Sequence, residues 1–79
     1  MKRVLTYDLK YADSNDYSEL YNYFKRVGAK QLTESSYLID SPLSLEEFKT
    51  KIRSLTKYGD NVKVISVNTA NELFVADIR

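Results

Sequence analysis

The apolar residues of this chain switch between the spacing of a β-strand and the spacing of an α-helix, and the order of these switches limits the possible folds. The strongest pattern is a capping box, Ser44 with Glu47 three residues later, which precedes an apolar stripe at helical spacing. We expect this helix to end near Lys57, before a turn that contains Gly59. The stripe consists of Leu45, Phe48, Ile52 and Leu55.

A second helical stripe lies earlier in the chain. Asp16 and Glu19 form a start that resembles a capping box, and Gly28 marks the end of the helix. Tyr23 falls off the stripe, so we expect its side chain to face solvent. The stripe itself consists of Tyr17, Leu20, Tyr21, Phe24 and Val27.

Strand-like segments surround both helices. The β-branched and aromatic runs at 2–9, 29–33, 35–40, 62–67 and 72–78 predict five strands, with the second and third joined at Glu34 as a hairpin or a bulged pair. The resulting order, βαββαβ with an extra C-terminal strand, predicts an α+β, ferredoxin-like fold with both helices on one face of an antiparallel sheet. No linker or composition shift divides the chain, so residues 1–79 are expected to form a single domain.

The composition excludes several kinds of chemistry. The sequence contains no histidine and no cysteine, which excludes a Cys/His zinc site, a disulfide framework and a Ser-His-Asp triad. Any bound metal would therefore need oxygen ligands. The net charge of +1 argues against a broadly basic nucleic-acid-binding face. No apolar stretch approaches the length of a membrane span, and we expect a cytoplasmic protein without membrane contact.

Two helices cover only one face of such a sheet. Apolar side chains on the other face then need a partner surface, and a second copy of the chain is the simplest one. A chain of 79 residues buries only roughly 60% of the surface that its unfolded form exposes. The sequence therefore predicts a homodimer.

Asp8 is the first candidate for chemistry, because it stands at the end of the predicted central strand. A carboxylate there points into the loop region, and Mg²⁺ or Mn²⁺ often uses only one or two protein carboxylates. Two subunits related by a dimer axis would supply two such groups. The alternative is that Asp8 only caps the strand or the turn over residues 10–15.

A second group of candidates carries hydroxyl, aromatic and basic side chains that suit contacts with a sugar-phosphate backbone or a base. For the aromatic members, packing within the sheet is the competing interpretation, and for the basic members it is an ordinary solvated surface. Residues 34–40 lack the aromatic signature of an RNA-recognition motif, which disfavours that class. The candidates for nucleic-acid binding are Tyr7, Lys10, Lys30, Ser35, Ser36 and Tyr37.

Several of these short motifs together resemble a known family. Tyr7-Asp8-Leu9 at the end of the first strand, Tyr17 and Leu20 opening the first helix, Gly28 closing it and the run over residues 34–39 are similar to the SinR-like branch of the CRISPR-associated Cas-two superfamily, which includes the VapD toxins. The resemblance implies a ferredoxin-like homodimer whose Asp8 lies across the interface from its twin and binds a divalent metal. Members include metal-dependent nucleases and non-catalytic scaffolds. Tyr37 departs from the Phe or Trp that the family usually has there.

Two functions remain open at this point. The first is a non-catalytic dimeric module that binds nucleic acid or another protein. The alternative is a divalent-metal-dependent endonuclease, acting on RNA or DNA, in which Asp8 from both subunits holds Mg²⁺ or Mn²⁺ and the metal activates water. The two hypotheses differ in whether activity depends on metal and on Asp8.

Overall fold

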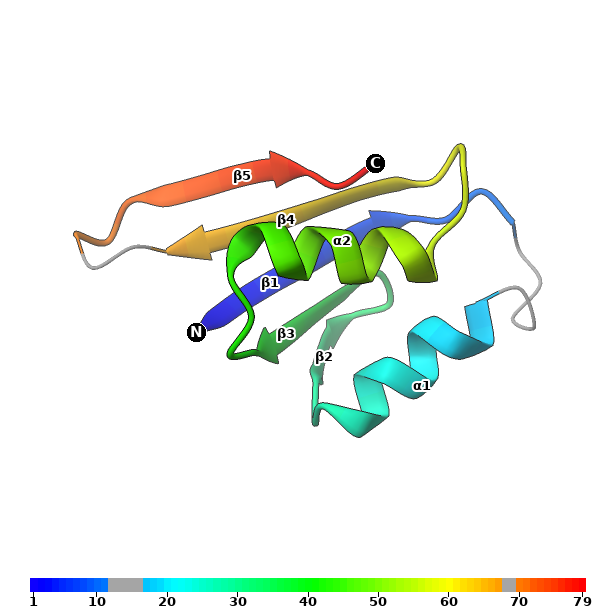
Figure 1. Cartoon of the computed structure of the whole chain (residues 1–79), viewed down its shortest axis with the longest axis horizontal. Helices are drawn as coiled ribbons and strands as arrows, with labels where there is room; N and C mark the ends of the chain where they lie inside the picture. Colours follow the sequence, from blue (N-terminus) through cyan, green and yellow to red (C-terminus); the bar gives the residue numbers. More distant parts are fainter. Residues whose placement is uncertain (12–16, 68–69) are drawn as a thin grey trace.

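The structure is a computed structural model that describes residues 1–11, 17–67 and 70–79. It contains two helices and five strands (Figure 1). In chain order these elements are β1 (Lys2–Asp8), α1 (Ser18–Arg26), β2 (Lys30–Thr33), β3 (Ser36–Asp40), α2 (Leu45–Leu55), β4 (Asn61–Val67) and β5 (Leu73–Asp77).

The five strands form one sheet with the order β2-β3-β1-β4-β5, and every neighbouring pair is antiparallel. The α+β class and the antiparallel sheet are therefore as the sequence predicted, and the arrangement is compatible with a ferredoxin-like fold. β1 lies at the centre, while β5 lies at one edge and pairs with β4 of its own chain (Figure 1). The β2–β3 pair shifts register between Gln31 and Thr33, which is the bulged pair expected around Glu34.

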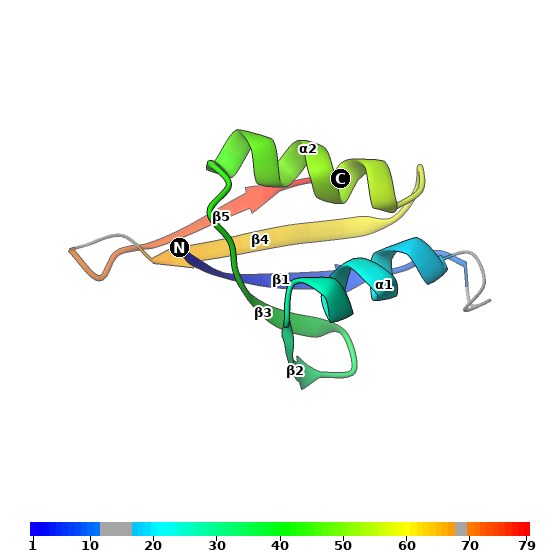
Figure 2. The ribbon, with the colours of Figure 1, turned by 60° about the horizontal axis from the view of Figure 1, so that its bottom comes forward.

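Both helices pack on the same face of the sheet (Figure 2). The ring of Phe24 on α1 lies 4.1 Å from the ring of Tyr37 on β3, and the guanidinium of Arg3 on β1 lies 5.3 Å from the ring of Phe48 on α2. Arg3, Leu5 and Tyr37 share this face because Arg3 and Leu5 are two residues apart and Leu5 is paired with Tyr37. No helix in the described parts of the chain covers the opposite face, which we call the open face.

The start and end of α2 follow its local sequence signals. The Ser44 hydroxyl accepts a hydrogen bond from the N–H of Glu47 at 3.2 Å, and the Glu47 carboxylate accepts one from the N–H of Ser44 at 3.1 Å. Beyond the helix, Gly59 adopts a φ of +96°, a left-handed conformation that favours glycine. The capping box and the turn were both predicted correctly.

The first helix differs from its prediction in two respects. It begins at Ser18 after Tyr17, and the expected capping residue Asp16 lies outside the described residues. Tyr23 is buried, with 5% of its surface exposed, so the expectation that it faces solvent was wrong. Its ring lies 5.6 Å from the Arg26 guanidinium and 5.5 Å from the Lys51 ammonium of α2. The second helix therefore covers a side of α1 that a sheet alone would leave open.

The core lies between the helices and the sheet. Its fully buried apolar side chains come from β1, both helices, β3 and β4, and Ile78 after β5 closes one end. The buried apolar residues are Leu5, Tyr7, Tyr17, Leu20, Tyr23, Phe24, Ile39, Phe48, Ile52, Val62, Val64 and Ile78.

Within the described ranges, neither helix is long and apolar enough to cross a membrane.

Candidate functional site

Asp8 is the last residue of β1 and lies opposite Asn61 of β4. Its side chain is exposed, and it borders a shallow hollow of about 210 Å³ that Thr6, Asn61 and Lys63 also line. Among the described residues, no hydrogen bond or ion pair engages the Asp8 carboxylate. The group is thus available to a ligand at this end of the sheet.

A single subunit offers little support for a metal at this position. Residues 1–11, 17–67 and 70–79 contain no group of three or more acidic side chains placed to hold one ion. A magnesium ion would need further oxygen ligands from water, from substrate or from a second subunit. Asp8 is therefore one ligand of an incomplete set.

The alternative role considered for Asp8 was to cap the end of its strand or the turn that follows. The contacts of such a cap are made by a neighbouring carboxylate, that of Asp60. One Asp60 oxygen, Oδ1, accepts hydrogen bonds from the N–H of Lys10 at 2.8 Å and from the hydroxyl of Tyr17 at 2.7 Å. The other oxygen, Oδ2, accepts one from the N–H of Lys57 at 2.7 Å. Asp60 thus joins the segment after β1, the start of α1 and the turn before β4. Of the turn expected over residues 10–15, residues 12–15 lie outside the described residues.

The electrostatics of Asp60 follow from these bonds. Burial of the carboxylate by itself raises its pKa, but the hydrogen bonds from Lys10, Tyr17 and Lys57, together with the charge of Arg79, outweigh burial and hold the pKa below its ordinary value. Asp60 is therefore an ionised, fully bonded structural group. Sequence reasoning missed it, because Lys10 and Tyr17, two of its three partners, lie far away in the chain and only the Gly59 turn marks its position.

Three of the six nucleic-acid candidates lie inside the fold. The Tyr7 ring is buried and stacks 6.4 Å from Tyr37, which itself packs against Phe24. Burial raises the pKa of the Tyr7 hydroxyl well above its usual range, and the neighbouring Tyr21 adds to the effect. The Ser36 hydroxyl bonds to that of Thr33 at 2.7 Å. These side chains serve the core and the β2–β3 hairpin in this conformation.

The other three candidates are exposed. Ser35 lies beside the end of β1, because its carbonyl accepts a hydrogen bond from the N–H of Tyr7 at 3.0 Å. Lys10 follows β1 at the same end of the sheet, and its ammonium lies 5.7 Å from the ring of Tyr11. Lys30 stands apart on the edge strand β2, opposite Leu38. The structure therefore brings Lys10 and Ser35 to the end of β1 that carries Asp8.

The open face carries a band of apolar side chains. Strand register places Leu38, Val4, Ile65 and Val75 side by side across four strands, and Val67 lies opposite Leu73 in a neighbouring row. Val75 is 63% exposed and Leu73 is 70% exposed. We call this set the open-face stripe: Val4, Leu38, Ile65, Val67, Leu73 and Val75.

Charges of both signs flank the open-face stripe. Lys63 of β4 forms an ion pair with Asp77 of β5, and Lys2 of β1 lies opposite Asp40 of β3. The amino group of Met1 bonds to Asp40 at 2.9 Å and lowers the pKa of that carboxyl, and Lys63 does the same for Asp77. Positive and negative groups therefore alternate around an apolar band.

No protein-family model matches this sequence, and no curated protein matches it significantly. The function must accordingly be argued from the geometry. The open-face stripe and the free carboxylate of Asp8 are the two features that bear on it.

Proposed function

We propose that this protein is a cytoplasmic, homodimeric interaction module of the Cas-two-like type, associated with nucleic acid or protein and without strong catalysis of its own. The single observation that carries the proposal is the open-face stripe, which spans four strands and lacks a covering element within the described residues. The order β2-β3-β1-β4 supports a ferredoxin-like topology, to which β5 adds a fifth strand beside β4.

A second copy of the chain is the occupant that suits this face. In a two-fold interface the same patch meets itself, so an apolar centre with charges of both signs around it is self-complementary. The pairs Lys63–Asp77 and Lys2–Asp40 give the open face this mixed rim. A standard interface takes about 800 Å² from each partner, which is a modest share of the 5276 Å² that one chain exposes.

Light scattering during size-exclusion chromatography tests this assembly. We expect the wild-type protein to have twice the chain mass of 9.2 kDa at micromolar concentration. Val75→Asp should give the mass of one chain, because it would bury a charge at the interface without a partner. Tyr58→Asp is the matched control, because Tyr58 is 89% exposed in the turn after α2 and should leave the dimer intact. A wild-type mass near 9.2 kDa would overturn the proposed dimer.

Nucleic acid is the partner class that the family resemblance implies, and the exposed Lys10, Ser35 and Lys30 are the proposed contacts. Backbone contacts by Lys10 and Lys30 would make binding weaken steeply as salt increases. Fluorescence anisotropy with labelled RNA and DNA measures this dependence. We expect the double variant Lys10→Ala/Lys30→Ala to bind more weakly than wild type. Equal binding by the wild type and the double variant would show that these lysines do not contact nucleic acid, and it would favour a protein partner.

A second candidate function, metal-dependent phosphodiester hydrolysis, is favoured by the position of Asp8. Residues at even positions of β1 share one face, so Asp8 lies on the open face with Val4 and Thr6. A two-fold axis through the stripe would bring two Asp8 carboxylates to one side of the dimer, where Mg²⁺ or Mn²⁺ could bind between them.

Nuclease assays on RNA and DNA with Mg²⁺, Mn²⁺ or a chelator separate the two candidates. A nuclease should cut only with metal, and Asp8→Asn should abolish cutting while the dimer persists. The interaction module predicts no cutting that depends on Asp8, and partner binding that the same substitution leaves intact.

A further inference from the structure

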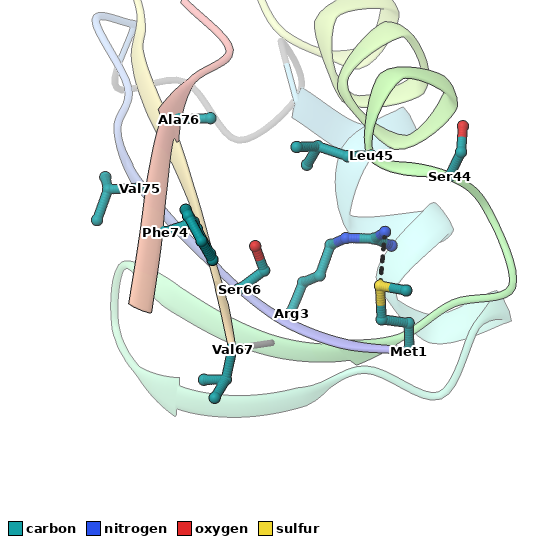
Figure 3. A pocket seen from close by; sticks show the side chains of 9 residues that line it. All are labelled: Met1, Arg3, Ser44, Leu45, Ser66, Val67, Phe74, Val75 and Ala76. Carbon is teal, nitrogen blue, oxygen red and sulfur yellow. Dashed lines mark hydrogen bonds between the residues drawn. The ribbon is translucent and has the colours of Figure 1, made fainter. Parts of the chain in front are cut away.

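An apolar groove lies on the helix-covered side of the molecule, between the start of α2 and the β4–β5 pair (Figure 3). Its volume is about 790 Å³. Leu45 of α2 faces Phe74 and Ala76 of β5 across it, and Arg3 and Met1 lie at its base. Pockets that take small ligands typically measure about 300–1000 Å³ and combine apolar walls with few polar groups, as this groove does.

The charged side chain in this groove is a buried cation. Arg3 is 2% exposed, and its Nη1 donates to the carbonyl of Leu43 at 2.9 Å. Its Nη2 donates to the sulfur of Met1 at 3.1 Å, and the face of the guanidinium lies over Phe48. The Nε of Arg3 is buried and has no hydrogen-bond partner. No carboxylate oxygen in the described parts of the chain lies within 4.0 Å of the guanidinium.

A buried guanidinium without a counter-ion is an unusual arrangement, because buried charges are normally paired. The Nε–H and the neighbouring Nη2–H project from one edge of the guanidinium, the edge that binds a carboxylate in a bidentate pair. In this structure the Nη2 half of that edge contacts only a thioether, which is a weak acceptor. The Met1 residue that supplies it is 69% exposed, so its unbranched side chain can move aside at low cost.

The geometry points to a ligand site for a monocarboxylate with an unbranched apolar chain. The carboxylate would displace the Met1 sulfur and accept hydrogen bonds from Nη2 and Nε of Arg3. The chain would lie along the groove between Leu45 and Phe74. One cation suits a single negative charge, and the apolar walls suit an alkyl chain rather than a phosphate, which is usually held by several donors.

This site goes beyond the proposed dimer, and its anchoring residue lies on the other face of the sheet. Arg3 and Phe74 lie on the helix-covered face, whereas the open-face stripe lies on the other. Val67 and Val75 border both surfaces, at the margin of the groove (Figure 3). Ligand binding and chain mass can be measured independently, so the failure of one proposal is distinguishable from the failure of the other.

The sequence supplies a specific probe, because Met1 is its one methionine. Protein labelled with ¹³C at the methionine methyl group gives a single resonance at the groove. We expect octanoate to shift this resonance saturably. Octanol, which has the chain without the charge, should bind about tenfold more weakly or worse, as expected when a charge-assisted pair is lost. Acetate and inorganic phosphate should give no saturation in the same concentration range.

Two variants test the role of the arginine. Arg3→Gln should weaken octanoate binding about tenfold or more and leave octanol binding nearly unchanged. Arg26→Gln is the matched control, because Arg26 is exposed at the end of α1 and should bind octanoate as the wild type does. If Arg3→Gln does not fold, the ligand series on the wild-type protein still decides the question.

Several results would overturn the proposal. Equal affinities for octanoate and octanol would show that Arg3 does not recognise the carboxylate. Phosphate or acetate binding as tightly as octanoate would show a general anion site without a role for the groove. A Met1 resonance that shifts with protein concentration, and no longer responds to octanoate, would show that a second copy covers the groove. The absence of any saturable shift would refute the site altogether.

Discussion

The substitution Asp60→Asn should destabilise the fold strongly, because the Asp60 carboxylate joins three segments: the chain after β1, the start of α1 and the turn before β4. Asparagine keeps the shape of aspartate but replaces one oxygen with an amide NH₂ group. If the remaining oxygen takes the place of Oδ1, it still accepts from Lys10 and Tyr17. The NH₂ group then faces the N–H of Lys57, where the present distance is 2.7 Å, and two donors oppose each other.

The expected cost can be worked out from these contacts. Leaving the half-buried N–H of Lys57 without an acceptor costs about 1–3 kcal/mol. The two remaining bonds lose their charge assistance, which removes about 0.5–1 kcal/mol from each. The free energy of unfolding should therefore fall by about 2–5 kcal/mol. For a domain of this size the melting temperature should drop by at least about 8 °C.

The pH dependence provides an independent check on the same substitution. The pKa of Asp60 is lower in the folded chain than its ordinary value of 3.8, so the folded state binds this proton more weakly. Its contribution to stability is complete above the ordinary pKa and is lost as the pH falls through the folded pKa. The difference between wild type and Asp60→Asn should accordingly be large at neutral pH and shrink in strong acid.

Urea unfolding followed by circular dichroism, at one protein concentration and at several pH values, measures both effects. Asp8→Asn is the matched control, because it makes the same chemical change at an exposed carboxylate without a partner in the described residues. It should change the free energy of unfolding by no more than about 0.5 kcal/mol. A loss below about 1 kcal/mol for Asp60→Asn at neutral pH, or a loss that persists unchanged in strong acid, would refute the reasoning.

Other contacts lead to further predictions. Phe24→Ala should cost about 3–5 kcal/mol in urea unfolding, because it removes the ring that packs on the aromatic cluster. Ser44→Ala should cost about 1 kcal/mol through loss of the helix cap, and Ser44→Asp should retain most of that stability. Gly59→Ala should cost about 1–2 kcal/mol, because φ is +96° there. Burial raises the pKa values of Tyr7 and, against the opposing charge of Arg26, of Tyr23. Ultraviolet absorbance should show that both hydroxyl groups ionise at a higher pH than those of exposed tyrosines. The free energy of unfolding should fall as the pH rises above about 10.

Features with local signals were predictable from the sequence. The capping box, a signal only four residues long from Ser44 to Glu47, marks the start of α2. The helical spacing of apolar residues that follows defines the buried face of this helix. Strand alternation likewise separated the two faces of β1, because neighbouring side chains of a strand point in opposite directions. The fold class followed from the order of such segments.

Features that depend on distant partners were not predictable in this way. Tyr23 lies off the stripe that faces the sheet, but α2 brings Lys51 over its ring, and no local pattern reports how two helices meet. Asp60 obtains its donors from Lys10 and Tyr17, and nothing near Asp60 indicates them. Arg3 is buried on the helix-covered face, two residues from Leu5, and the sequence did not single it out.

The central position of β1 also constrains the order in which the chain folds. This first strand pairs with β3 and β4 alone, so Arg3 meets Ile39 on one side and Ser66 on the other. Contacts between such distant residues form slowly, since long loops must close before any pairing stabilises them. During synthesis, β1 therefore leaves the ribosome before β3 and β4, and both of its edges are paired only once β4 has been made. Until then, the unpaired edges of β1 are a site at which nascent chains would associate wrongly. In refolding experiments followed by hydrogen exchange, the amide hydrogens of β1 are expected to become protected late.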